Sequence, residues 1–213
     1  MSSSNIQRDQ LFLKVGSHTV FVETEFQLED GSEETMTGTG FFVAENLVLT
    51  AAHVVVPKNG KVTAIGVKYK GIKYVKPTDP TIESQLLEVI PPMDPDIYNP
   101  LEDLAIIKCP MRSPHFLRLS TEKPSKGDDV QIVGYPGNVD KDWLSSRHPS
   151  LKDPDSDIEV VKQLLPRRKL TVSEGEVSEI KDGCARHRAS TIPGMSGGCL
   201  VYQGQVCGKS TVV

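Results

Sequence analysis

Short β-prone segments separated by turn residues run through most of this chain and constrain its fold more than any other feature. The first three, residues 11–28, 38–52 and 61–75, are rich in β-branched and aromatic side chains and are broken by Gly, Asn or Lys-Gly. Similar runs follow at residues 103–109, 128–137, 169–180 and 198–213. Many short strands with turns between them are typical of an all-β barrel or sandwich.

Length and composition narrow the class of protein. The 213 residues are enough for one compact unit or for two small cores packed together. The formal net charge of −4 gives no sign of a surface for nucleic acid. No apolar run is long enough for a signal peptide or a membrane span, so we expect a cytoplasmic protein without membrane contact.

A polar, proline-bearing segment divides the strands into two groups. It covers residues 112–128, and we interpret it as a linker between an N-terminal β domain, residues 1–111, and a C-terminal β domain, residues 129–213. Residues 139–167 show little strand character and are predicted to be an insertion in the second domain. A variable surface loop is the simpler alternative for this insertion.

The stretch TIPGMSGGCLVY, residues 191–202, crowds glycines around Ser196. Such a serine can sit in an ordinary tight turn. It can also be a nucleophile, whose neighbours must lack side chains so that a substrate and backbone N–H groups can approach it. A serine nucleophile needs a base to take its proton and an acid to orient that base.

One histidine and one aspartate are candidates for those partners. His53 follows an apolar run and sits beside two alanines that leave room for a second barrel, and Thr50 is expected to cap a single helical turn there. Asp103 leads into another apolar run, where a buried carboxylate would need a donor such as an imidazole Nδ1–H. The alternatives are that His53 is a hydrogen-bonded structural histidine and that Asp103 only ends a turn, with Glu102 solvated beside it.

Taken together, these motifs resemble those of trypsin-like (chymotrypsin-fold) serine proteases. GTGFFVAENLVLTAAHVV, residues 38–55, is similar to the family's signature around its histidine. EDLAIIK and GMSGG are similar to its Asp-Leu-Ala strand and its nucleophile loop, and the chain order His53, Asp103, Ser196 is that of the family. The likeness is closer to HtrA-type and other bacterial-like members than to digestive trypsins.

The resemblance implies a fold and a reaction. The fold is all-β, with two antiparallel six-stranded barrels, an active site in the cleft between them and a second barrel lacking its last strand. The reaction is that of a serine endopeptidase, which cleaves a protein or peptide substrate through an acyl-enzyme. Ser196 is the nucleophile, His53 the base and Asp103 its orienting acid, while the N–H groups of Gly194 and Ser196 form the oxyanion hole.

The resemblance also indicates the region that recognises substrate. Ser190, Thr191, Ser210 and Thr211 are expected to line the substrate-binding side of the site, with a small or medium uncharged residue preferred before the scissile bond. Met195 stands where zymogen-activated members carry an aspartate, so activation by propeptide cleavage is not expected.

The expected missing strand leads to a partner prediction and a rival function. A downstream domain or a partner chain is expected to complete the second barrel, because proteins seldom leave an apolar sheet edge uncovered. The alternative function is a non-catalytic or latent protease-fold module that binds peptide or a partner through the incomplete barrel.

No cofactor or metal is expected. Four residues of the second half could in principle bind zinc, but their spacing is loose and ordinary thiols are the simpler interpretation; they are Cys184, His187, Cys199 and Cys207. A disulfide between the last two is disfavoured in a reducing compartment.

Overall fold

The computed structural model describes residues 12–56, 60–69, 85–90, 103–109, 111–137 and 169–211, and for 12 and 85–90 the backbone alone. The predicted insertion at 139–167 lies outside these residues. Strands of the first group are β1 (Thr19–Gln27), β2 (Glu33–Ala44), β3 (Leu47–Thr50), β4 (Lys61–Lys68), β5 (Gln85–Ile90) and β6 (Leu104–Lys108). Those of the second are β7 (Asp129–Gly134), β8 (Thr171–Lys181), β9 (Cys184–His187), β10 (Cys199–Tyr202) and β11 (Gln205–Lys209).

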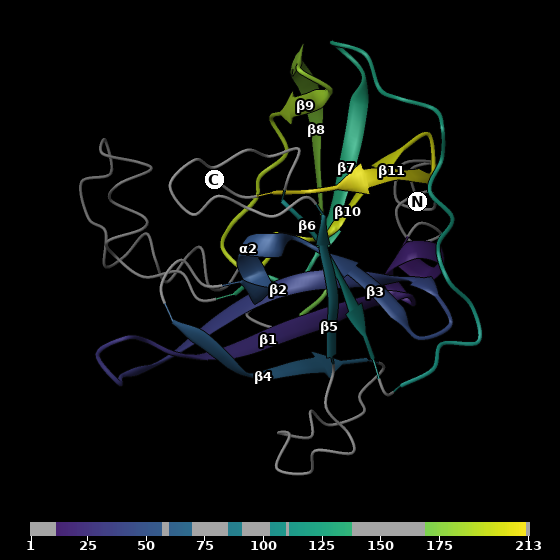
Figure 1. The fold of residues 1–213 in the computed structure, drawn as a ribbon. Helices are drawn as coiled ribbons and strands as arrows, with labels where there is room; N and C mark the ends of the chain where they lie inside the picture. The colour runs from purple at the N-terminus through teal and green to yellow at the C-terminus, as the bar shows by residue number, and fades with distance from the viewer. Residues whose placement is uncertain are drawn as a thin grey trace.

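The strands form two antiparallel sheets. The first has the order β4-β1-β2-β3-β6-β5 and the second, among the described residues, the order β11-β10-β7-β8-β9. Figure 1 shows the first sheet in the lower half of the view and the second in the upper half, with the short helix α2 (Ala52–Val55) where they meet. The predicted all-β, two-sheet fold is confirmed.

Strand β2 contributes to the cores of both halves. Successive side chains of a strand point to opposite faces, so its neighbouring residues Phe41 and Phe42 must enter different environments. Phe42 packs with Val54 and Val55 of α2 in the first core, whereas Phe41 packs with Val133 in the second. Because both phenylalanines are fully buried, β2 connects the two cores directly.

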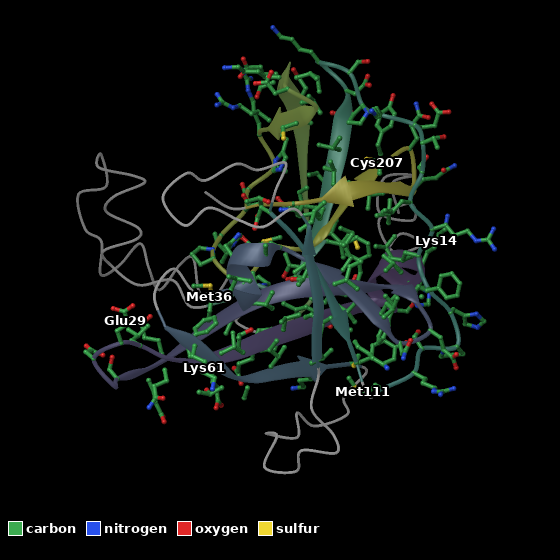
Figure 2. All side chains as sticks on the ribbon, viewed as in Figure 1. Lys14, Glu29, Met36, Lys61, Met111 and Cys207 are labelled. Carbon is green, nitrogen blue, oxygen red and sulfur yellow. The ribbon has the colours of Figure 1, made fainter. Side chains whose placement is uncertain are left out.

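The N-terminal run differs from the expectation of one long strand. Residues Phe12–Gly16 form a π-helical turn (η1), and β1 begins only at Thr19. The side-chain hydroxyl of Thr19 donates to the carbonyl of Val15, which ends the turn at this point. Val15 belongs to the second core, and Lys14 donates to the carbonyl of Gly204 at the β10–β11 turn, on the side of β11 in Figure 2. The N-terminal turn therefore packs with the C-terminal half.

The segment between the two groups of strands contains no strand in the residues described, 111–128. Its backbone is hydrogen-bonded to both sheets: Leu117 donates to Phe42 of β2, and Ser120 donates to Val206 of β11, at 2.8 and 2.7 Å. These bonds attach the connection along its length to both halves. Within the described residues, no helix has the length and apolarity that crossing a bilayer requires.

Candidate active site

His53 lies in α2, the single helical turn that follows β3. Val54 and Val55 of this turn are fully buried and anchor it to the first core, while the His53 side chain keeps 26% exposure. The prediction that Thr50 caps the turn was wrong. Ala51 is the N-cap and offers no side-chain bond, and the Thr50 hydroxyl, one residue too early, donates instead to the carbonyl of Thr39 at 2.7 Å.

Asp103 stands immediately before β6 and is fully buried. Its Oδ1 accepts the backbone N–H of His53 at 2.9 Å, and the His53 Nδ1 is 3.0 Å from each carboxylate oxygen. An ionised carboxylate only accepts hydrogen bonds, so Nδ1 carries the proton of the neutral ring and Nε2 is left as the basic nitrogen. This geometry is what a general base needs from its orienting acid.

Asp103 is held as a carboxylate although it is buried. Burial by itself would raise its pKa, because the charged form loses its hydration. The hydrogen bond and charge of His53 and the charge of Lys209 oppose this, and the pKa of Asp103 lies well below its usual range.

Lys209, the last residue of β11, and Thr211, two residues further on, complete the surroundings of the carboxylate. Lys209 Nζ donates to Asp103 Oδ2 at 2.7 Å, and the Thr211 hydroxyl donates to the same oxygen at 3.1 Å. Lys209 also donates to the Thr211 hydroxyl. The Lys209 side chain is 7% exposed, so this ion pair is buried, and it joins the first sheet to the second.

Ser196 lies in the loop before β10 and is 4% exposed. Its carbonyl accepts the backbone N–H of Thr39 in β2 at 2.8 Å. The next residue, Gly197, has φ +84°, and a Cβ there would collide with the carbonyl of Thr39 and lie against the backbone of Ala51. The absence of that side chain lets the serine loop pack against the segment that leads into His53.

The loop before Ser196 forms a type II turn. The N–H of Met195 donates to the carbonyl of Ile192 at 3.1 Å, and Gly194, the third residue of the turn, has φ +90°. Pro193 and Gly194 are the residues that a type II turn favours at its two central positions. Met195 itself is fully buried.

This turn orients the backbone group predicted to form the oxyanion hole. The carbonyl of Pro193 accepts the N–H of Gly137 at 2.6 Å, and the carbonyl of Gly194 accepts the hydroxyl of Thr39 at 2.7 Å. Because the N–H and C=O of a trans peptide point in opposite directions, the Gly194 N–H points away from Gly137. A Cβ on Gly194 would run into the backbone of Gly137, so only glycine fits here.

Thr39 connects this loop to the first sheet. Besides the bonds to Ser196 and Gly194, its hydroxyl accepts the N–H of Tyr135 at 2.8 Å, and its carbonyl accepts the Thr50 hydroxyl. Nothing in the local sequence marks Thr39 as part of the site, although it lies within the histidine motif.

The four residues expected to bind substrate fall into different environments. Ser190 is exposed and Thr191 half-buried. Ser210 is 3% exposed, and its hydroxyl has no hydrogen-bond partner within the described residues. The Thr211 hydroxyl donates to Asp103, and the place of this residue beside the substrate stays a prediction.

The cysteines considered as metal ligands all have free thiols. Burial raises the pKa of Cys199 far above its usual value and also raises that of Cys207. The described residues include no group of three or more side chains able to share a metal ion.

A family model for the trypsin-like peptidase domain matches residues 38–208. The chain belongs to the trypsin-like peptidase family. The matched range includes the His53 helix, the start of β6 and the Ser196 loop, whose motifs resemble those of this family.

Curated relatives of this peptidase include the serine proteases Rv3671c and MT3772 from two strains of Mycobacterium tuberculosis, each 30% identical over 105 residues. The alignment covers 49% of this chain and 21% of each relative, so the chain spans about a fifth of their length. These likenesses support a proteolytic function.

Solved structures share the fold. The active form of the M. tuberculosis Rv3671c protease aligns with a TM-score of 0.61 at 22% identity, over 97% of this chain and 74% of that one. The inactive form aligns with a TM-score of 0.56 at 21% identity, over 97% and 82%.

Proposed function

We propose that this trypsin-like peptidase is a serine endopeptidase that cleaves peptide bonds through an acyl-enzyme. Ser196 attacks the scissile carbonyl, and His53 takes the serine proton at Nε2 and later donates it to the leaving amine. Asp103 holds the Nδ1–H tautomer and stabilises the imidazolium that forms. A polypeptide is the proposed substrate, and neither a cofactor nor a metal takes part.

The observation that carries the proposal is the pairing of His53 with a fully buried carboxylate. Asp103 accepts both the ring Nδ1–H and the backbone N–H of His53, which sets the orientation and tautomer of the ring together. A charged carboxylate is costly to bury, so a role in orienting a base explains its presence better than packing does.

The turn at Gly194 supports the second part of the mechanism. Its N–H points away from the Gly137 anchor, and we propose that it donates, with the N–H of Ser196, to the oxyanion of the tetrahedral intermediate. A donor of this kind is worth roughly 10²–10³-fold in turnover. The Pro193–Gly194 pair holds the peptide in place before substrate binds, so no reorganisation is needed during the reaction.

We further propose that Ser190, Thr191 and Ser210 contribute to the pocket for the residue before the scissile bond. The buried Ser210 hydroxyl, without a partner among the described residues, is a group that a substrate atom could satisfy. None of the three side chains carries a charge, which supports the expectation of a small or medium uncharged residue there.

The decisive experiment is labelling with a fluorophosphonate followed by peptide mass spectrometry. The adduct is expected on Ser196 alone, and Ser196→Ala should abolish labelling with an unchanged circular dichroism spectrum. Ser125→Ala, in the connection between the sheets, is the control and should label normally. A folded wild-type protein that stays unlabelled would contradict the proposal and favour the rival, a non-catalytic or latent module.

The open edge supports a proposal about partners. Among the described strands, β11 pairs only with β10, and on its other side the backbone of Val206 already accepts the N–H of Ser120, so a further strand would have to pair beyond that contact. We propose that a downstream segment or a partner chain pairs there, in an intracellular setting. A longer native chain should then melt at a higher temperature and label faster than these 213 residues, and equal values would contradict the idea.

A further inference from the structure

Lys209 is an unusual neighbour for the Asp103 carboxylate. Lysine is almost never buried unless it is paired, yet the Lys209 side chain is 7% exposed and its Nζ lies 2.7 Å from Asp103 Oδ2. Its place is set by backbone bonds: Lys209 is opposite Cys199 in β10, and the following residue, Ser210, exchanges bonds with Gly197 and Gly198. The contact therefore follows from the packing of the nucleophile loop.

Lys209 is not required merely as a hydrogen-bond donor. His53 contacts both carboxylate oxygens, and the Thr211 hydroxyl donates to Oδ2. Lys209 adds a positive charge beside the carboxylate. In the proposed mechanism the same carboxylate also balances the charge of the imidazolium. Two cations sharing one carboxylate repel each other, and burial weakens the screening of that repulsion.

We propose that Lys209 is a positioning residue that fixes the Asp103 carboxylate and displaces proton uptake by His53 to lower pH. The proposal rests on the proposed function for its catalytic consequence.

The surrounding charges are consistent with this role. The pKa of Lys209 lies below its usual value because burial removes the hydration of the ammonium, although Asp103 and, more weakly, Cys184 of β9 act to raise it. We infer that the pair is charged at neutral pH from the 2.7 Å contact between Lys209 Nζ and the ionised Asp103 carboxylate. Of the strands packed on α2, β1 directs Glu23 to the face opposite the buried Val22, and β6 carries Lys108 exposed at its far end.

The test compares neutral and charged replacements of Lys209. Lys209→Met keeps the apolar stem, Lys209→Gln keeps a polar donor, and Lys209→Arg keeps the charge. Lys181→Met, which removes an exposed lysine at the end of β8, is the matched control. The first measurement is the NMR titration of the His53 ring, whose signal is assigned by its loss in His53→Gln.

Removing the cation should let His53 take up its proton more readily, so the midpoint moves upward. We expect a rise of about one pH unit in the Met and Gln variants, from two charges several ångströms apart in a partly buried site. The Arg variant and the Lys181→Met control should keep the wild-type midpoint. An unchanged midpoint in folded neutral variants, or the same rise in the Arg variant, would overturn the proposal.

The second measurement is the pH dependence of fluorophosphonate labelling at Ser196. Its acid limb should move upward by the same amount, so that labelling well below both midpoints is roughly tenfold slower in Lys209→Met. If the NMR midpoint shifts but Ser196 is labelled neither in the wild type nor in any variant, the proposed function is refuted and the role of Lys209 stands. Unfolding of both neutral variants would overturn the proposal, because Lys209 would then serve the fold.

Discussion

Replacing Asp103 with asparagine should reveal how strongly the buried ion pair contributes to stability. Asn keeps the size and one oxygen acceptor of the aspartate but removes its charge. The Lys209 ammonium then loses its carboxylate partner, although the Lys209 side chain is only 7% exposed. Removal of one member of a buried pair typically costs about 3–5 kcal/mol, because an uncompensated charge remains.

We expect Asp103→Asn to lower the free energy of unfolding by about 3 kcal/mol, the lower end of that range, because the amide oxygen still accepts one bond. Urea denaturation followed by circular dichroism measures it. The double variant Asp103→Asn/Lys209→Met, which removes both charges, should recover at least half of the loss. Glu45→Gln, which breaks the exposed pair with Arg112, should leave stability nearly unchanged.

The double-mutant cycle also provides the refutation. If Asp103→Asn costs less than about 1 kcal/mol and the effects of the two changes simply add, the two side chains do not form a buried charged pair. The description of the carboxylate as the junction of the two sheets would then be wrong.

Three further predictions concern other features of the site. Gly197→Ala should cost more than about 2 kcal/mol and abolish labelling of Ser196, since the new Cβ meets the Thr39 carbonyl at a positive φ; the urea midpoint measures it. The depressed pKa of Asp103 adds stability that is present above pH ~4 and lost as the pH falls, so acid titration of Asp103→Asn should show a flatter profile. Cys199 should resist iodoacetamide in the native state and react only after unfolding, as intact-mass measurement can show.

Much of the fold and the pairing at its centre was accessible from local sequence. Alternating β-branched residues and turn signals indicate strands within each segment, and the structure confirms the all-β fold. His53 and Asp103 were paired through the resemblance of their two motifs to those of trypsin-like serine proteases, because each residue alone also had a structural interpretation. The register and hydrogen bonds then place the two side chains 3.0 Å apart.

The remaining features depend on contacts that local sequence does not encode. Lys209 lies 106 residues from Asp103, and only the docking of β11 against the first sheet brings them together. The same docking brings the Thr211 hydroxyl to the carboxylate, a contact that its local sequence does not indicate. Threonine is a favoured N-cap residue, yet the Thr50 hydroxyl donates to the Thr39 carbonyl instead. This tertiary bond overrides the local preference.

The bonds of Thr39 have a consequence for the order in which activity arises during synthesis. The ribosome releases β2 long before residues 194–196, so the first sheet can fold and present the Thr39 backbone and hydroxyl to a loop that emerges later. Neither half should be competent when produced alone, because one lacks the proposed nucleophile Ser196 and the other lacks the strand that shapes the Ser196 loop. Mixing separately produced fragments, divided within residues 112–128, should restore labelling at Ser196 only as the two halves associate.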